Sequence, residues 1–508
     1  MPRRNEYDLM CIGSGPAGQR AAIQAAKLGK RAVVIEKQPW IGGVCIATGT
    51  IPSKTFREAV CRLSTQPQLD SADTEAYAVR RRPTMPQLLG QVGRVMHREM
   101  QIISDALRRN DVDLVHGLAS FVEPHTVRVE TGTDQRLLTA DHILLAVGTR
   151  PSQPPGMAPD GHTVITSDDI LTLPQLPRTM AVVGAGVIGI EYASMFAALG
   201  VHVTVIDQRP RPLEFLDQEM GDALLHQLRN SDVLFRCGDA VEHIDMVQTP
   251  QRQGLIRLAS GKYLVADVIV CAAGRVGATE ALHLEAVGLA ADARGRLQVD
   301  SSYRTAVEHI WAVGDVIGFP ALAATSSEQG RLAACAMFGV HADAMPSHFP
   351  VGIYAIPEVA MVGATEEELT RQQIPYETGL ARYQEIARGV ILGDDSGLFK
   401  MLFHREDGRL LGCHCLGSGA TELIHIGQAV LALGGGLEYF LHTVFNYPTL
   451  AECYKVAAYN AANKLALIRQ ATGAIVPAIA EQATAAAGPA IAEERRDGVN
   501  RTQVRRGS

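Results

Sequence analysis

The sequence lacks the features of a membrane-spanning or nucleic-acid-binding protein. No uncharged apolar run reaches the ~18 residues that a membrane-spanning helix needs. Basic residues are not in excess either, because 47 lysines and arginines face 54 acidic residues and the net charge is −7. Nucleic acids and anionic membranes favour proteins with basic patches. We therefore expect neither of these partners.

The nine cysteines lack the spacing of a zinc site or of a disulfide framework. Free cysteines are typical of a reducing compartment, and Glu6 and Asp8 interrupt the apolar stretch that a signal peptide needs. We therefore expect a soluble, cytoplasmic protein. The run Cys413-His414-Cys415 lies in an apolar stretch that predicts a buried strand, and C-x-C with one histidine is a poor zinc pattern. No metal site is predicted.

An internal repeat indicates how the chain is organised. Residues 9–37 read LMCIGSGPAGQRAAIQAAKLGKRAVVIEK, and residues 180–208 read MAVVGAGVIGIEYASMFAALGVHVTVIDQ. Each copy predicts an apolar strand, a helix, and a second strand that ends in an acid. A constant offset aligns Gly13, Gly15, Gly18 and Glu36 of the first copy with Gly184, Gly186, Gly189 and Asp207 of the second.

The repeated pattern is typical of dinucleotide binding. The first glycine allows a tight turn, the second lets a pyrophosphate approach the backbone, and the third lets the helix pack on the strand. Free N–H groups at the helix N-terminus hold the pyrophosphate, and the acid, ~20 residues further on, accepts hydrogen bonds from a ribose diol. Because every part occurs twice, ordinary glycine turns are a poor alternative. The chain is predicted to bind two dinucleotides and thus two electron carriers.

Three further segments read as buried strands that end in glycine. HILLAVGTRP (142–151) contains Gly148 and DVIVCAAGRV (267–276) contains Gly274, as expected where a chain leaves a nucleotide-binding domain. EHIWAVGDVIG (308–318) ends in Gly314 and Asp315. An acid at a strand end can be an ordinary cap. Its place after the second copy predicts instead that the chain returns to complete the first domain.

Together these residues resemble the flavoprotein disulfide reductase family, which includes lipoamide dehydrogenase and glutathione reductase, over about residues 5–465. The resemblance implies that the first copy, with Glu36 and Gly43, binds the ADP half of FAD, and that Asp315 holds the ribityl chain. The second copy would bind the nicotinamide nucleotide. Residues from about 347 onward would form the interface of a homodimer.

The resemblance implies an α/β fold with two Rossmann-like dinucleotide-binding domains and a C-terminal α+β dimerisation domain. We expect the FAD-binding domain to comprise residues 1–152 and 277–345, the NAD(P)-binding domain residues 153–276, and the dimerisation domain residues 346–468. Residues 469–508 form an Ala-rich tail that we expect to be mobile or a loose helix.

The chain departs from the family pattern at its redox centre. The family has two cysteines in G-G-x-C-x-x-x-x-C-x-P-S-K, whereas this chain has Cys45 and then Thr50, which can supply neither a disulfide nor a thiolate. The family's C-terminal His-Pro-Thr is here Tyr447-Pro-Thr, although Glu452 occupies the place of the family's glutamate. Disulfide reduction needs a thiol pair and an acid/base group. We therefore predict that this chain does not reduce disulfides.

The family's hydride chemistry is retained. Lys54 and Glu191 match the family's ion pair beside the reactive nitrogen of the flavin, where a cation tunes the cofactor. The alternatives are a surface lysine and a helix N-terminal acid. Cys45 and Thr50 are the other candidate catalytic residues, and Cys45 is either a relic packed near the flavin or a sulfenic-acid centre.

Within the family, the lost cysteine, G-T-I-P-S-K and F-N-Y-P-T resemble the soluble, FAD-dependent transhydrogenases that act on NADP(H) and NAD(H). This resemblance implies ping-pong transfer from NADPH to NAD⁺ through one nucleotide site, of the Si-specific type. Asp207 favours a free ribose 2′-OH, whereas Arg209 and Arg211 are placed to bind a 2′-phosphate. A plain NAD enzyme, a reductase of quinones or other small acceptors, and a non-catalytic binding subunit remain alternatives.

Overall fold

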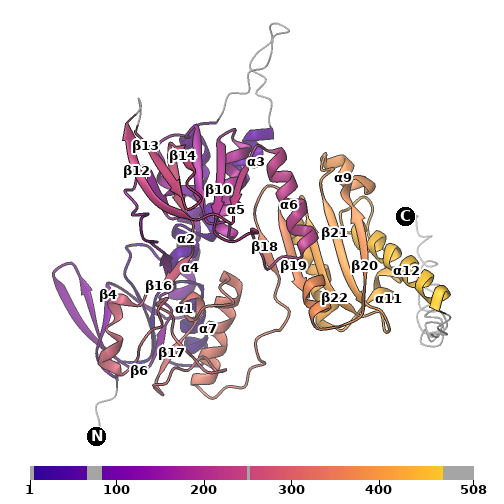
Figure 1. Ribbon diagram of the computed structural model, residues 1–508. Helices are drawn as coiled ribbons and strands as arrows, with labels where there is room; N and C mark the ends of the chain where they lie inside the picture. The colour runs from indigo at the N-terminus through magenta and orange to yellow at the C-terminus, as the bar shows by residue number, and fades with distance from the viewer. Residues whose placement is uncertain (1–4, 66–82, 249–251, 473–508) are drawn as a thin grey trace, which may run out of the picture.

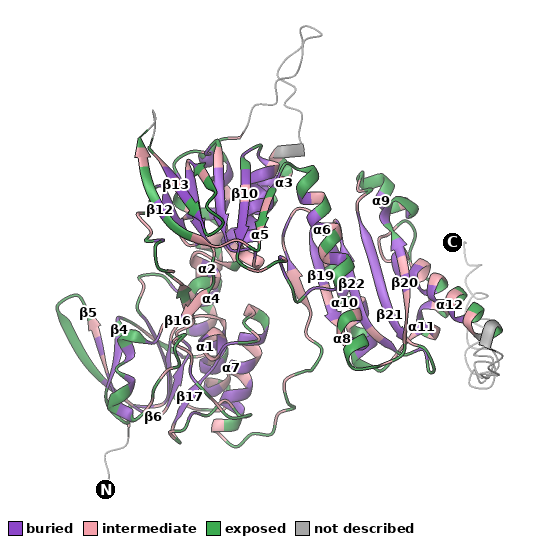
Figure 2. Ribbon diagram, in the orientation of Figure 1, coloured by how far each residue is buried: buried purple, intermediate pink, exposed green. Residues whose placement is uncertain are grey.

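The computed structural model describes residues 5–65, 83–248 and 252–472. The Ala-rich tail predicted for residues 469–508 lies outside the described residues from 473 onward. Figure 1 shows two bodies at the left, one above the other, and a third at the right that contains β18 to β22. In each body the strands at the centre of the sheet are buried (Figure 2). Within the described ranges, no helix combines the length and apolar character needed to cross a bilayer.

The first sheet contains the first copy of the repeat at its centre. Strands β3-β2-β1-β6-β17 run parallel, and β6 extends into an antiparallel ladder with β5 and β4. Strands β1 and β2 are almost fully buried, which explains their continuous runs of apolar residues. The strands are β1 (Tyr7–Ile12), β2 (Ala32–Glu36), β3 (Asp113–His116), β4 (Leu118–Glu123), β5 (Thr126–Thr131), β6 (Asp134–Leu145) and β17 (Ile310–Ala312).

Helices cover one face of this sheet, and α1 and α7 pack directly on each other. Strand β17 follows the second repeat in sequence yet pairs with β6, so the chain returns to the first sheet. The helices of this part are α1 (Pro16–Lys27), α2 (Gly43–Ala47), α3 (Thr50–Thr65), α4 (Met85–Arg109) and α7 (Ala323–Met337).

The second sheet is wholly parallel, in the order β11-β10-β9-β15-β8. An antiparallel sheet, β12-β13-β14, packs beside it, and the short ribbon β7-β16 lies where the chain enters and leaves this region. The elements are β7 (Thr149–Pro151), β8 (Val164–Thr166), β9 (Thr179–Val183), α5 (Val187–Ala198), β10 (His202–Asp207), α6 (Gln218–Asn230), β11 (Leu234–Cys237), β12 (Val241–Gln248), β13 (Arg252–Leu258), β14 (Tyr263–Ala266), β15 (Val268–Cys271) and β16 (Arg275–Gly277).

The third sheet is antiparallel, in the order β18-β19-β22-β21-β20, and helices pack against it. Its β22 buries Cys413, His414 and Cys415, so the strand predicted there is confirmed. The elements are β18 (Val351–Ile353), β19 (Val359–Gly363), α8 (Glu366–Arg371), β20 (Tyr376–Arg382), α9 (Ala387–Leu392), β21 (Leu398–His404), β22 (Leu410–Leu416), α10 (Ala420–Ala432), α11 (Leu437–His442) and α12 (Glu452–Thr472).

The glycines of both repeats are needed for close packing. Gly13 has a φ of +110°, and a Cβ there would overlap the carbonyl of Ala146, the residue that follows β6. A Cβ on Gly18 would overlap the carbonyl of Gly13. Gly184 and Gly189 of the second copy are constrained in the same way, by Ala272 and Gly184 respectively. Together with the sheets, this packing confirms the predicted fold class.

Candidate functional site

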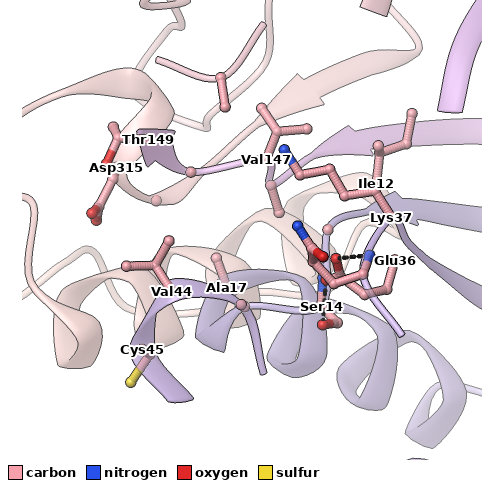
Figure 3. Close-up of a pocket in the computed structure, with 18 of the residues that line it drawn as sticks. Ile12, Ser14, Ala17, Glu36, Lys37, Val44, Cys45, Val147, Thr149 and Asp315 are labelled. Carbon is pink, nitrogen blue, oxygen red and sulfur yellow. Dashed lines mark hydrogen bonds between the residues drawn. The ribbon is translucent and has the colours of Figure 1, made fainter. Parts of the chain in front are cut away.

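A groove of about 350 Å³ lies at the carboxyl ends of the central strands of the first sheet. Its lining brings together residues that are far apart in sequence, and Figure 3 shows Glu36 and Asp315 towards opposite ends with Ala17 between them. A groove of this size is typical of a cofactor site. The lining includes the predicted residues Gly13, Gly15, Glu36, Gly43, Cys45, Thr50, Gly148, Gly314 and Asp315.

Two helix N-termini offer free backbone donors. Helix α1 begins after Gly15 and α5 begins after Gly186, and no side chain of the described residues caps either end by a hydrogen bond. Gly43 packs so closely that a Cβ there would lie 3.0 Å from the Cα of Gly15. Uncapped N–H groups together with the helix dipole bind anions such as a pyrophosphate.

Glu36 is held by a network that includes a residue the sequence reasoning missed. The Oγ of Ser14 donates to Glu36 Oε2 at 2.6 Å and accepts from the N–H of Gly42 at 2.9 Å. Glu36 also accepts from the backbone N–H groups of Ser14 at 3.1 Å and Gln38 at 2.9 Å. No ion pair to Glu36 forms within the described ranges. The sequence contained a signal for Ser14, because the two copies of the repeat differ here: the second copy has Ala185 at the position of Ser14.

Asp207 occupies the same place in the second copy but has a cationic partner. It repeats the two backbone contacts, from Ala185 at 2.6 Å and from Arg209 at 2.8 Å. The Arg209 side chain adds two bonds, from Nε at 3.0 Å and from Nη2 at 2.7 Å. Burial alone would raise the pKa of Asp207, but these hydrogen bonds hold it below its ordinary value. The two copies thus differ in charge around the acid that ends the second strand of each repeat.

Arg211 does not join Arg209. Its Nη2 donates to Asp222 Oδ1 at 2.7 Å, and both side chains line a separate hollow of about 320 Å³ together with Arg229. The predicted pair of arginines is therefore divided between two acidic partners. Gly274, with a φ of +111°, lies between β15 and β16, at the exit of the second sheet.

Asp315 lies in the short 3₁₀ helix Gly314–Ile317 that follows β17. Burial raises the pKa of its carboxyl, while a 3.3 Å hydrogen bond from Ser326 opposes the rise. The N–H of Gly314 is held separately by Gln329 at 2.8 Å. Since a carboxylate has about four acceptor sites, Asp315 retains capacity for hydroxyl groups of a bound molecule.

Cys45 and Thr50 lie next to each other where α2 ends and α3 begins. Burial raises the pKa of the Cys45 thiol, and the hydrogen bond with Thr50 only partly opposes this. The sulfur of Cys45 points away from the other labelled side chains in Figure 3. No disulfide joins any of the nine cysteines, all of which lie within the described residues. A protonated thiol without a neighbouring thiol is a poor redox centre.

Lys54 and Glu191 form the ion pair that joins the first and second parts of the chain. Lys54 Nζ, on α3, lies 2.9 Å from Oε1 and 2.7 Å from Oε2 of Glu191, on α5. The lysine side chain is 25% exposed and the glutamate side chain 4%. Glu191 also accepts from the N–H of Tyr354 at 2.9 Å, and the ring of Tyr354 lies 4.9 Å from Lys54 Nζ. Sequence reasoning missed Tyr354.

Two further groups of polar residues lie in the third part of the chain or where it meets α6. Tyr447, which replaces the family's histidine, is exposed, and Glu452 Oε2 is buried without a hydrogen-bond partner among the described residues. Asp217, Glu219 and Glu366 form the acidic cluster with a spacing that could suit a metal. These three carboxylates converge instead on the buried ammonium of Lys400.

Comparison with known proteins agrees with this geometry. Residues 7–330 match the family model of the pyridine nucleotide-disulphide oxidoreductases, and residues 349–458 match the model of the dimerisation domain of these enzymes. The chain belongs to the pyridine nucleotide-disulphide oxidoreductase family. The family resemblance inferred from the sequence is therefore confirmed.

Relatives within this oxidoreductase family cover nearly the whole chain. A soluble pyridine nucleotide transhydrogenase of Mycobacterium tuberculosis is 50% identical over 467 residues, 92% of this chain and 99% of the relative. The soluble pyridine nucleotide transhydrogenase of Aliivibrio fischeri is 44% identical over 473 residues, 91% and 98% of the two chains. The Cu(II) complex of the HOCl-induced flavoprotein disulfide reductase RclA of Escherichia coli superposes with a TM-score of 0.81 at 25% identity, covering 90% of this chain and 99% of that one.

Proposed function

We propose that this oxidoreductase is a soluble pyridine nucleotide transhydrogenase that uses FAD to transfer hydride from NADPH to NAD⁺. The observation that supports it best is the Lys54–Glu191 pair, which joins two complete dinucleotide-binding units while the thiol pair of disulfide reduction is missing. The two relatives described above have this name at 50% and 44% identity. They favour this activity over the reduction of quinones or other small acceptors.

The groove of the first unit fits the FAD. The N–H groups of α1 would hold the pyrophosphate, Glu36 would accept hydrogen bonds from the ribose, and Asp315 would accept from the ribityl chain. When bound, the flavin supplies reversible two-electron chemistry that both nucleotides share. The residues of the chain bind and orient the reactants, and none of them has to form a covalent bond.

Lys54 would supply positive charge near the flavin ring. Glu191 accepts both of its hydrogen bonds and is itself almost fully buried, so the ammonium is fixed in position. A fixed charge is effective because it needs no reorganisation during the reaction. Thr50 and Cys45 would line the same region as neutral groups, since burial raises the pKa of Cys45.

Arg209 would allow the second unit to accept both nucleotides. Its guanidinium is 42% exposed and offsets the charge of Asp207, which would otherwise repel a 2′-phosphate. With NAD(H), Asp207 would accept from the 2′-OH, and with NADP(H), Arg209 would donate to the phosphate. Arg211 would contribute less, because it lies with Asp222 at a separate hollow and makes no bond to Asp207.

The remaining parts of the proposal concern the organisation of the protein. We place the domain boundaries at residues 152, 276 and 345, since the β7-β16 ribbon spans the first two crossings. The dimerisation domain indicates a homodimer. We also propose the Si-specific type of transfer and a cytoplasmic location, and the lack of disulfides among the nine cysteines supports this location.

An anaerobic mixture of the purified yellow protein with NADPH and thio-NAD⁺ tests the activity. We expect rapid formation of reduced thio-nucleotide, followed by its absorbance, without quinone or dithiol. NADPH deuterated on one face tests the stereochemical type. If NADPH bleaches the flavin but thio-NAD⁺ is not reduced, the acceptor is a different compound and the proposal is wrong.

A further inference from the structure

One short segment of the third part of the chain contacts both dinucleotide-binding units. In residues 354–358, the N–H of Tyr354 donates to Glu191 at 2.9 Å and the N–H of Ile356 donates to Ser194 Oγ at 3.0 Å, both on α5. On the other side, Arg57 of α3 donates to the carbonyl of Ala355 at 3.0 Å. The segment therefore lies between the helix of Lys54 and the helix of Glu191.

A buried ion pair and a shared core fix this segment. Arg57 Nη2 lies 3.0 Å from Glu358 Oε1, and both side chains are largely buried. Phe56 of α3 and Phe196 of α5 pack with their ring centroids 5.8 Å apart and their planes tilted by 34°, in the same hydrophobic core as Ile353. Elements with this many buried contacts keep their geometry, so Tyr354 has a defined position relative to Lys54.

The ring of Tyr354 contacts the ammonium of Lys54. Nζ lies 4.9 Å from the ring centroid, within the ~6 Å range of a cation–π interaction. The ring is half-buried, and the Tyr354 hydroxyl has Thr421 of α10 as a hydrogen-bond partner. Thr421 in turn donates to Glu358 Oε2 at 2.8 Å. The orientation of the ring is thus set by the third sheet and its helix.

We propose that Tyr354 is a positioning residue that holds the Lys54 ammonium beside Glu191 through the face of its ring. A second carboxylate at this place would hold the lysine but also cancel its charge. An aromatic face attracts the cation by its quadrupole and adds no negative charge. The ring thereby helps to keep Lys54 in one place without adding a second negative charge beside the Glu191 carboxylate. This inference rests on the proposed role of Lys54 in the FAD enzyme.

The test compares Tyr354→Leu, which removes the ring, with Tyr354→Phe, which keeps the ring and loses only the hydroxyl. In each FAD-loaded protein we would measure the midpoint potential of the flavin and the anaerobic rate of bleaching by NADPH. For Tyr354→Leu we expect a lower potential, because the Lys54 ammonium is held less firmly beside the reduced flavin, and bleaching about three to tenfold slower. Tyr354→Phe should keep the wild-type potential and a rate within about twofold.

Phe338→Leu is a matched control, because it removes a different ring, 5.0 Å from Lys30 Nζ. It should leave the flavin potential unchanged. If Tyr354→Leu fails to fold, progressively fluorinated phenylalanines at position 354 weaken the ring quadrupole without changing its shape, and the potential should fall with each step. A wild-type potential in Tyr354→Leu or throughout the fluorinated series, or an equal loss in Tyr354→Phe, overturns the proposal.

Neither readout depends on NAD⁺. A wild-type protein that NADPH bleaches, but that does not reduce thio-NAD⁺, would refute the transhydrogenase and leave the comparison at position 354 interpretable. Conversely, normal transhydrogenation with no effect of the ring would refute only the role of Tyr354. The two failures are therefore distinguishable.

Discussion

The difference between Arg209 and Gln38 predicts which substitution separates the two nicotinamide nucleotides. These residues occupy the same position in the two copies, and the backbone N–H of each donates to its acidic neighbour, Asp207 or Glu36. Only Arg209 adds a guanidinium. Arg209→Gln therefore gives the second unit the side chain that the first unit has. We expect it to impair the use of NADPH and to spare the use of NADH.

The expected loss of kcat/KM for NADPH follows from the interactions that Arg209→Gln removes. A hydrogen bond to a charged group contributes about 1.5–3 kcal/mol, which corresponds to about 10- to 150-fold in kcat/KM. Arg209 is 42% exposed, so solvent screening places the expected loss for NADPH near the lower end, about 10- to 50-fold. Asp207 also loses its counter-ion and would repel a 2′-phosphate. For NADH, which has only a 2′-OH, we expect a change of less than about threefold.

Stopped-flow bleaching of the flavin measures the two nucleotides separately. Each reductive half-reaction is recorded anaerobically at several nucleotide concentrations and at low and high salt. With NADPH, the advantage of the wild-type protein over Arg209→Gln should shrink at high salt, because a partly exposed charge pair is screened. Arg211→Gln is the matched control and should cost less, since Arg211 pairs with Asp222 at a separate hollow and not with Asp207. Equal losses for NADPH and NADH in Arg209→Gln would refute the reasoning and assign Arg209 a purely structural role.

Three further predictions concern the cofactor groove, the lost disulfide and the response to acid. Ser14→Ala removes a hydrogen bond to Glu36 and leaves the buried N–H of Gly42 unpaired. FAD should therefore bind about 5- to 30-fold more weakly in a fluorescence titration. An unchanged affinity would contradict this. Thr50→Cys should form a disulfide with the adjacent Cys45 on oxidation. An anaerobic NADPH titration should then need one more equivalent of NADPH per subunit, because the disulfide takes up two electrons. An unchanged end point would count against this prediction. Burial lowers the pKa of both His142 and His309. As the pH drops below about 6.5, the unfolded chain therefore takes up protons at these histidines before the folded protein does, and the free energy of unfolding should fall. Replacing both residues by Asn should weaken this fall in denaturant titrations, and an unaltered pH dependence would argue against the assignment.

The sequence by itself determined the fold class and the family. The paired glycines, the acids at Glu36 and Asp207 and the apolar strands recur at a constant offset, and this local pattern depends only on backbone sterics and periodic burial. The replacement of the second cysteine by Thr50 was equally legible, because it is a matter of residue identity. The structure and the family models confirm the fold class and the family. The individual roles of the site residues stay predictions.

Only the tertiary structure decided which side chains meet. Arg209 and Arg211 look equivalent in the sequence. In the structure, Arg209 bonds to Asp207 at the end of β10, whereas Arg211 bonds to Asp222 on α6. The contact between Tyr354 and Lys54 joins residues 300 positions apart through the packing of three sheets. No periodic pattern in the sequence encodes such a contact, because it depends on how elements that are distant in sequence pack against one another.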